Sequence, residues 1–211
     1  MKSLISRTFV LCFLTFYLSG CSILKTQEEP INDSTVDASI LHEHHMVLID
    51  NIEQFALTGR LGVMTNPKGF SGRVAWHHTP DNDNIDVFSP LGGKVANIIK
   101  TNEEVVLTNG KDEHIAAPDT ETLTEETLGF RLPLNGLSYW ALGRPSNTGL
   151  VEYVTWDENG RINQLKQNDW DIQYLDYEVN EGYFLPKKIV LRTEELIIKL
   201  IVEKWSYIQT R

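Results

Sequence analysis

The chain has 211 residues, of which 41% are hydrophobic and 23% charged, and its formal net charge at pH 7 is −10. This length suits one domain with a sizeable core. The acidic balance argues against a nucleic-acid partner, because phosphate backbones are bound by clusters of Lys and Arg. It also provides no electrostatic attraction to anionic lipid.

The first residues have the layout of a secretory signal peptide. Lys2 and Arg7 give a positive start, and residues 8–18 form an apolar run of 11 residues. A transmembrane helix needs about 20 such residues, so the run is too short to span a bilayer. It ends in the segment "LSGC", which resembles the lipobox of bacterial lipoproteins. The alternative is an ordinary secretory signal followed by a coincidental cysteine.

The lipobox resemblance implies that residues 1–20 are removed and that Cys21 becomes a lipidated N-terminus. One myristoyl chain binds membranes only marginally, so several acyl chains on Cys21 would make attachment effectively permanent. The mature chain would keep 17 basic and 29 acidic residues, a net charge of −12. It would have no disulfide, because Cys12 leaves with the signal and Cys21 is blocked. Ser22 is not the aspartate that retains lipoproteins at the inner membrane, which implies the periplasmic face of the outer membrane of a Gram-negative bacterium.

Residues 21–38 are expected to be the lipidated cysteine and a flexible tether, because the stretch is polar and acidic. The folded domain is expected over residues 39–211. Its first element is predicted as an amphipathic helix over Ile40–Gln54, with Ser39 as the N-cap. Four apolar residues recur near helical spacing: Leu41, Leu48, Ile52 and Phe55.

Beyond this helix the period of the apolar residues changes from that of a helix to that of a strand. Alternation runs through "LTGRLGV" (57–63), "GRVAWHH" (72–78) and "WDIQYLD" (170–176). Turn signals such as "NPKG", "DENG" and "NEG" separate the runs, which predicts an antiparallel meander. The segment "LIIKLIV" (196–202) is apolar on both faces, so it is either simple core or a wall with protein on one side and ligand on the other.

Two short helices are predicted to interrupt the meander, in "APDTETLTEETLGF" and "LPLNGLSYWALGRP". In the second, Asn135 is suited to cap the start and Gly143 to follow the last turn, while Pro145 prevents continuation. Together with the N-terminal helix they would cover one face of the sheet without closing it. The predicted fold is therefore mainly β with some α (α+β), an incomplete antiparallel barrel with a helical lid.

Five segments, in order, carry a resemblance to a known family: "FALTGRLGV", "FSGRVAW", "DVFSPLGGKVANI", "LGFRLPLNGLSYWALGRP" and "LPKKIVL". They resemble the outer-membrane lipoprotein receptor family LolB, and the resemblance extends from Phe55 to Trp205. It implies an incomplete barrel of about eleven strands with helices over its open side and an apolar cavity.

The same resemblance implies a receptor that takes acylated lipoproteins from the periplasmic carrier LolA and inserts them into the inner leaflet of the outer membrane. Its partners would be LolA, its lipoprotein cargo and outer-membrane lipid, and the chain would act as a monomer. No nucleotide, metal or other cofactor, no nucleic acid and no enzymatic step are expected. Two alternatives remain: a lipoprotein that binds a small apolar ligand or lipid without a carrier, and a structural lipoprotein without a cavity.

A membrane-insertion loop is implied at Pro90, Leu91 and Gly92, in the tight connection "SPLGG". By the resemblance, the leucine at the tip of this turn enters the headgroup region and prompts insertion of the cargo. For a leucine judged from sequence alone, folding back onto the core is the alternative.

The cavity or its lid is expected to contain Arg60, Trp76, Leu137 and Trp140. By the resemblance, Arg60 would tether the lid through hydrogen bonds to backbone carbonyls of the helical cover, which suits its planar donors. A solvated surface arginine is the alternative for Arg60, and ordinary core positions are the alternative for the two tryptophans.

Several other patterns give only weak signals. His42 and His45 share a helix face, but no cysteine or well-placed acidic residue completes a metal site, which favours a solvated helix face. "DNDNID" at 81–86 begins like a calcium loop but lacks the glycine at its sixth position, so a hairpin turn is expected there. "GFSG" is not a nucleophile elbow, and no carboxylate pair lies in an apolar context, so the sequence does not favour an enzyme.

Overall fold

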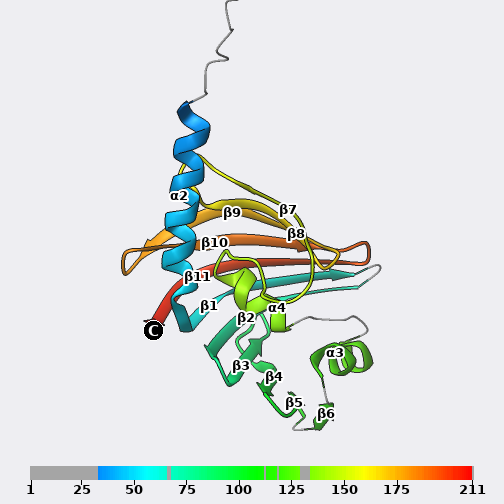
Figure 1. The fold of residues 1–211 in the computed structure, drawn as a ribbon. Helices are drawn as coiled ribbons and strands as arrows, with labels where there is room; N and C mark the ends of the chain where they lie inside the picture. Colours follow the sequence, from blue (N-terminus) through cyan, green and yellow to red (C-terminus); the bar gives the residue numbers. More distant parts are fainter. Residues whose placement is uncertain (1–32, 66–67, 112, 118, 129–133, 211) are drawn as a thin grey trace, which may run out of the picture. The chain divides into compact units, whose positions relative to one another are not determined.

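Strands paired in one antiparallel sheet make up most of the structure, a computed structural model that describes residues 33–65, 68–111, 113–117, 119–128 and 134–210 (Figure 1). The 11 strands found in these residues are β1 (Ile52–Thr65), β2 (Gly69–Thr79), β3 (Asn82–Phe88), β4 (Lys94–Thr101), β5 (Val105–Asn109), β6 (His114–Ala117), β7 (Val151–Trp156), β8 (Ile162–Gln167), β9 (Trp170–Asn180), β10 (Tyr183–Arg192) and β11 (Leu196–Thr210).

The sheet is open, with β6 at one edge and β7 at the other. Its strand order is β6-β5-β4-β3-β2-β1-β11-β10-β9-β8-β7, so the chain makes two meanders joined in the middle by pairing of β1 with β11. Short turns join most neighbours, as antiparallel strands allow. The α+β fold class and the incomplete antiparallel barrel predicted from the sequence are confirmed.

Alternation along the strands assigns the side chains to the two faces of the sheet. In β11, whose segment is apolar on both faces in the sequence, Leu196, Ile198, Leu200 and Val202 are buried, and the residues between them are partly or fully exposed. In β2, Val74 and Trp76 are buried and their neighbours Arg73 and His77 are exposed. One face of the sheet therefore carries the apolar core, and the other is largely polar.

The first described helix, α2 (Asp33–Asp50), begins and ends earlier than predicted. Residues 33–38 are helical rather than tether, and Ser39 lies within the helix instead of capping it. Ile52 and Phe55 are buried residues of β1, not of the helix. The helix ends at Asp50. The side-chain amide of the next residue, Asn51, donates a hydrogen bond to the carbonyl of Val47 (2.9 Å) and so binds one of the last free carbonyls of the helix.

Helices α3 (Thr120–Leu128) and α4 (Leu134–Ala141) lie between β6 and β7 in the chain, as predicted. Asn135 is the second residue of α4 and not its cap. At the other end Gly143 adopts φ +79°, and the N–H of Arg144 donates to the carbonyl of Tyr139 at 3.2 Å. The N–H of Gly143 donates to the carbonyl of Trp140, completing the Schellman arrangement that the sequence "ALGRP" indicated.

No helix within the described residues combines the length and apolar character needed to cross a bilayer. Cys21 and the signal segment lie outside the described residues, so their roles remain expectations.

Candidate functional site

An apolar cavity of about 470 Å³ lies between the inner face of the sheet and α4. Its size falls in the roughly 300–1,000 Å³ range of small-molecule sites. Among the described residues that line it, Lys68 is the one charged side chain. The lining residues are Leu61, Val63, Thr65, Lys68, Gly69, Phe70, Val74, Trp76, Ile85, Val87, Val95, Ala96, Ile98, Leu107, Leu134, Leu137, Trp140, Ala141, Ile189, Leu191, Ile198 and Leu200.

Trp76, Leu137 and Trp140 are among the residues that line this cavity. Leu137 and Trp140 come from α4. Figure 1 shows this helix between β6 and β7 along the chain. Such a wall can hold a flexible apolar chain by burial alone, because it offers little polar surface for directional bonds.

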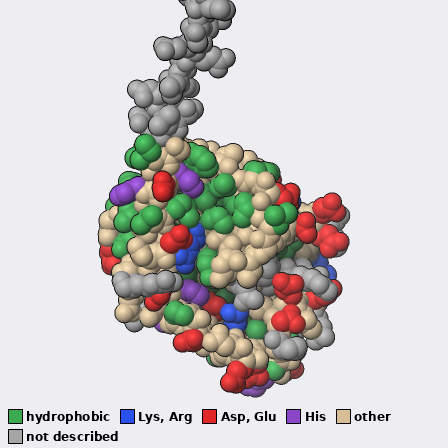
Figure 2. All heavy atoms as spheres, viewed as in Figure 1, with side chains coloured by type: hydrophobic (Ala, Val, Ile, Leu, Met, Phe, Trp, Pro, Cys, Tyr) green, Lys and Arg blue, Asp and Glu red, His purple; other side chains and the backbone are tan. Residues whose placement is uncertain are grey.

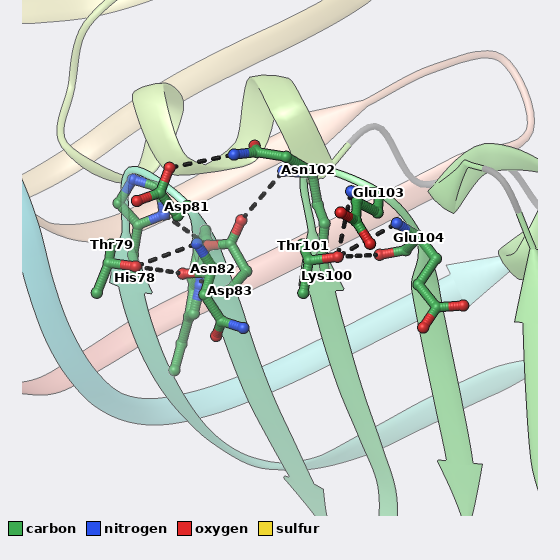
Figure 3. Close-up of polar contacts among 11 residues, drawn as sticks. His78, Thr79, Asp81, Asn82, Asp83, Lys100, Thr101, Asn102, Glu103 and Glu104 are labelled. Carbon is green, nitrogen blue, oxygen red and sulfur yellow. Dashed lines mark hydrogen bonds and ion pairs between the residues drawn. The ribbon is translucent and has the colours of Figure 1, made fainter.

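A buried carboxylate holds Trp76 in the wall. The indole Nε1–H of Trp76 donates to Oδ1 of Asp83 at 2.8 Å, and Nδ1 of His78 lies 2.6 Å from the same oxygen. Nζ of Lys100 is 3.6 Å from Oδ2 of Asp83. His78, Asp83 and Lys100 are register neighbours across β2, β3 and β4, and Figure 3 shows them at the turn end of these strands.

This contact also explains "DNDNID": Asp83 points inward and bonds a tryptophan. Within the described residues no group of three or more His, Cys, Asp or Glu is arranged to hold a metal ion. Sequence reasoning missed the role of Asp83. The sequence signal that could have indicated this role is an acidic residue at an inward-facing position of an alternating strand.

Trp140 is fixed from the opposite side by β8 and β9. Its Nε1–H donates to Oε1 of Gln167 at 3.0 Å, and its backbone carbonyl accepts from the hydroxyl of Tyr174 at 2.9 Å. Gln167 is fully buried and its amide also donates to the carbonyl of Ser146 at 2.9 Å. Burial raises the pKa of the Tyr174 hydroxyl, so it remains a protonated donor. The helix that covers the cavity is thus tied to the sheet through polar groups behind the apolar wall.

Leu91 is 98% exposed in the connection between β3 and β4. The turn is closed by two backbone bonds, from the N–H of Ser89 to the carbonyl of Gly93 at 2.8 Å and from the N–H of Gly92 to the carbonyl of Ser89 at 2.9 Å. Pro90 and Gly92 are exposed as well. The alternative in which Leu91 folds back onto the core is therefore excluded, and the turn presents a leucine to the surroundings.

Comparison with known proteins agrees with this architecture. The sequence profile described as "Outer membrane lipoprotein LolB" matches residues 53–205. The chain belongs to the LolB family. It is accordingly an outer-membrane lipoprotein receptor that acts in lipoprotein localisation.

Individual LolB proteins are similar over most of their length. The outer-membrane lipoprotein LolB of Nitrosococcus oceani is 30% identical over 200 residues, covering 95% of this chain and 97% of that protein. The LolB of Thiobacillus denitrificans is 34% identical over 154 residues, covering 73% of this chain and 81% of that protein. Among solved structures, a LolA superfamily protein from Nitrosomonas europaea is similar at a TM-score of 0.47 and 9% identity, covering 82% of this chain and 93% of that one.

Arg60 is not at the cavity of this LolB-family chain. Its side chain lies on the outer face of β1, where Nε is 3.1 Å from Oε1 of Glu203 on β11. The side chain is 62% exposed. The reason is the alternation of β1, which buries Leu57 on the inner face and turns Arg60 outward. The expectation that Arg60 tethers the lid is therefore replaced by its alternative, a surface arginine.

The arginine that binds backbone carbonyls next to the helical cover is Arg144, just after α4. Its Nη1 donates to the carbonyl of Ile49 at 3.1 Å, and its Nη2 donates to the carbonyl of Ile52 at 3.2 Å. The guanidinium also lies over the ring of Tyr139, 4.8 Å from its centroid. One planar side chain thus joins the end of α4 to the junction of α2 with β1. "GRP" after a helix was visible in the sequence, but its distant partners were not.

The histidine face of α2 is packed rather than solvated, which corrects the sequence interpretation. The ring of His42 stacks on Trp156 at 4.4 Å, and its Nδ1 is 2.8 Å from the carbonyl oxygen of Gly160. Gly160 has φ +77°, and a Cβ there would lie 2.2 Å from the backbone nitrogen of His42. His45 is 6% exposed and meets the ring of Tyr177 edge-on at 6.5 Å.

His45 should make the stability of the chain fall in mild acid. Burial, followed by the nearby charges of His42 and Arg161, lowers the pKa of His45 from 6.5 to about 4; Asp157 opposes the shift and His44 adds to it. Between pH 6.5 and about 4, His45 is therefore protonated in the unfolded chain but neutral in the folded chain. The free energy of unfolding is consequently highest above pH 6.5 and decreases as the pH falls towards 4.

Urea unfolding at pH 7 and pH 4.5 tests this. Relative to His45→Phe, which keeps a ring but does not titrate, the unmodified chain should lose about 2 kcal/mol more between the two pH values. His44→Gln, at an exposed position of the same helix, should keep the larger loss. Equal losses in the unmodified chain and His45→Phe would contradict the assignment.

Proposed function

We propose that this chain receives acylated lipoproteins from the carrier LolA into the cavity and releases them into the inner leaflet of the outer membrane. The observation that carries the proposal is the open apolar cavity of about 470 Å³ lined by the sheet and α4. Acyl chains lose about 0.8 kcal/mol for each CH₂ exposed to water, so a cargo with several chains must stay covered during transfer. A cavity in the receptor that succeeds a cavity in the carrier meets that requirement.

The transfer is noncovalent and proceeds downhill, from weaker binding in the carrier through the receptor to the bilayer. The cavity offers burial rather than directional bonds, which suits cargo that differs in its protein part but shares its acyl chains. The chain acts as a monomer, without metal, nucleotide or nucleic acid. Its LolB membership and its lipobox-like segment support attachment to the periplasmic face of the outer membrane by lipid on Cys21.

The proposal is tested with the mature chain carrying Cys21→Ala, mixed with LolA that holds an acylated lipoprotein and with phosphatidylcholine vesicles. Cargo should move from LolA to the chain and then to the vesicles. Leu137→Glu places a charge in the apolar wall and should reduce acceptance by about tenfold or more, because an unpaired charge in an apolar site is strongly disfavoured.

Leu175→Glu is the matched control, since Leu175 is 54% exposed and does not line the cavity. It should accept cargo like the unmodified chain. If cargo stays on LolA with every variant while the chain still binds free lipid, the carrier-independent alternative is the better account. If Leu137→Glu and Leu175→Glu behave alike, the cavity is not the binding site.

A further inference from the structure

Helix α2 carries a second apolar surface besides the one it packs against the sheet. His45 and Ile49 are buried on the packed face, with exposures of 6% and 0%. On another side of the helix lie four exposed apolar residues: Ile40 (58%), Leu41 (45%), Val47 (58%) and Leu48 (39%). We call these four residues the α2 stripe.

The members of the α2 stripe lie on one side of the helix. They stand at positions i, i+1, i+7 and i+8, and the exposed His44 lies between the two pairs at i+4. Single exposed apolar residues are ordinary on protein surfaces, but two apolar pairs on one side of one helix indicate a contact surface. In Figure 2 hydrophobic side chains gather on the upper part of the face shown, over α2 and the neighbouring strands.

The position of the α2 stripe in the chain indicates what it contacts. Only residues 22–32 separate Cys21 from the start of α2 at Asp33. Fully extended, these 11 residues reach at most about 40 Å. An anchored Cys21 would therefore keep α2, before any other folded element, within reach of the bilayer surface.

We propose that the α2 stripe lies on the lipid surface to which the chain is anchored. The inference rests on the proposed lipidation of Cys21. The helix contains no lysine or arginine, so charge attraction to anionic lipid does not contribute and the contact is apolar. Four apolar side chains bind a bilayer weakly by themselves, but a short tether raises the effective concentration of the helix at the surface to the millimolar range.

The stripe and Leu91 lie towards opposite ends of the strands. Helix α2 leads into the start of β1 and packs on Gly160 in the turn between β7 and β8. The strand register places the β3–β4 turn with Leu91 at the other end, beside the β1–β2 turn. The stripe would thus hold the anchored end of the domain, leaving the Leu91 turn to act separately when cargo is released.

The test uses the acylated full-length protein in phosphatidylcholine vesicles. With Cys21 blocked by lipid, a nitroxide is attached to Leu48→Cys in the stripe or to Glu43→Cys, an exposed position that the helical repeat places about 140° around the helix from residue 48. Oxygen, which concentrates in the bilayer, should relax the label at 48 more than a water-soluble nickel chelate does. The label at 43 should show the reverse order.

A second arm does not require the anchor. The mature chain with Cys21→Ala should bind phosphatidylcholine vesicles weakly and without salt dependence, and Ile40→Asn with Val47→Asn should lower this binding about tenfold. Mass measurement of the N-terminal peptide shows separately whether Cys21 is acylated. If Cys21 carries no lipid, the proposed anchor is wrong, and the vesicle binding of the Cys21→Ala chain then tests the stripe by itself.

Three results would overturn the inference. An acylated chain whose label at 48 is as accessible to the nickel chelate as the label at 43 would show that the stripe faces water. Shielding of the label at 48 only after LolA is added would assign the stripe to a protein partner. Unchanged vesicle binding in the Ile40→Asn, Val47→Asn chain would show that binding does not use the stripe.

Discussion

Leu91→Glu should give a receptor that accepts cargo from LolA but does not release it to vesicles. The change is confined to the tip of a turn where the side chain is 98% exposed, so the cavity and the free energy of unfolding should be unaffected. Cargo should therefore accumulate on the receptor. The measurement is the distribution of a labelled lipoprotein among LolA, the Cys21→Ala chain and vesicles over time.

The expected size of the effect follows from the prediction, implied by the family resemblance, that this leucine enters the membrane. Burying a leucine side chain is worth roughly 1.5–3 kcal/mol, so losing that contact slows delivery by about ten- to a hundredfold, and the added carboxylate increases the deficit. Leu175→Glu introduces the same charge at another exposed leucine and should deliver normally. If both variants delivered cargo at the unmodified rate, the turn at 89–93 would have no part in release.

The parts of this fold that were predictable are those governed by local rules. Alternation in "GRVAWHH" predicted the buried face of β2, and "ALGRP" predicted the end of α4, because each depends on near neighbours in the chain. The prediction that Trp76 and Trp140 line a cavity or its lid depended on the family resemblance. From the residues alone, an ordinary core position was an equal alternative for both tryptophans.

The errors arose where contacts between distant segments decide the structure. Ile52 and Phe55 continue the helical spacing of the apolar residues in α2, but they belong to β1. Because β1 has register shifts near residues 52–56, the spacing of its first apolar residues does not show that a strand has begun. His42 and His45 look like residues of a solvated face until Trp156 and Tyr177 are brought against them.

The arginines illustrate the same limit. Arg60 and Arg144 both offer planar donors, and only the folded chain shows that Arg144 is the one that reaches the carbonyls between α2 and β1. Periodicity assigns a side chain to a face of its own element. It does not identify the element that will pack there.

Asp83→Ala should cause the largest loss of stability among single changes near the cavity. Asp83 is 2% exposed, and its carboxylate accepts from Trp76 while lying against His78 and Lys100. Removing it leaves a buried indole N–H and a largely buried ammonium without their partner. Removing one member of a buried charged pair typically costs 3–5 kcal/mol, so we expect a loss of about 3 kcal/mol in the free energy of unfolding.

Two further variants separate the contributions. Asp83→Asn keeps an oxygen acceptor for Trp76 but removes the charge beside Lys100, so its loss should be smaller than that of the alanine variant. Asp81→Ala removes a carboxylate two residues away, which is exposed and accepts a hydrogen bond from Asn102 at 3.1 Å, and it should change stability by less than about 0.5 kcal/mol. Urea unfolding of the three variants provides the comparison.

The Asp83→Ala change should alter the wall of the cavity as well as the stability of the chain. With Asp83 replaced by alanine, Trp76 loses the acceptor that fixes its indole, and its ring gains freedom to turn into or away from the space that an acyl chain would occupy. Without urea, and at a temperature at which the chain is still folded, cargo acceptance from LolA should therefore be lower for Asp83→Ala than for the unmodified chain. Asp83→Asn should accept cargo better than Asp83→Ala. Equal stability and equal acceptance for Asp83→Ala and Asp81→Ala would show that the buried carboxylate does not hold Trp76 in place.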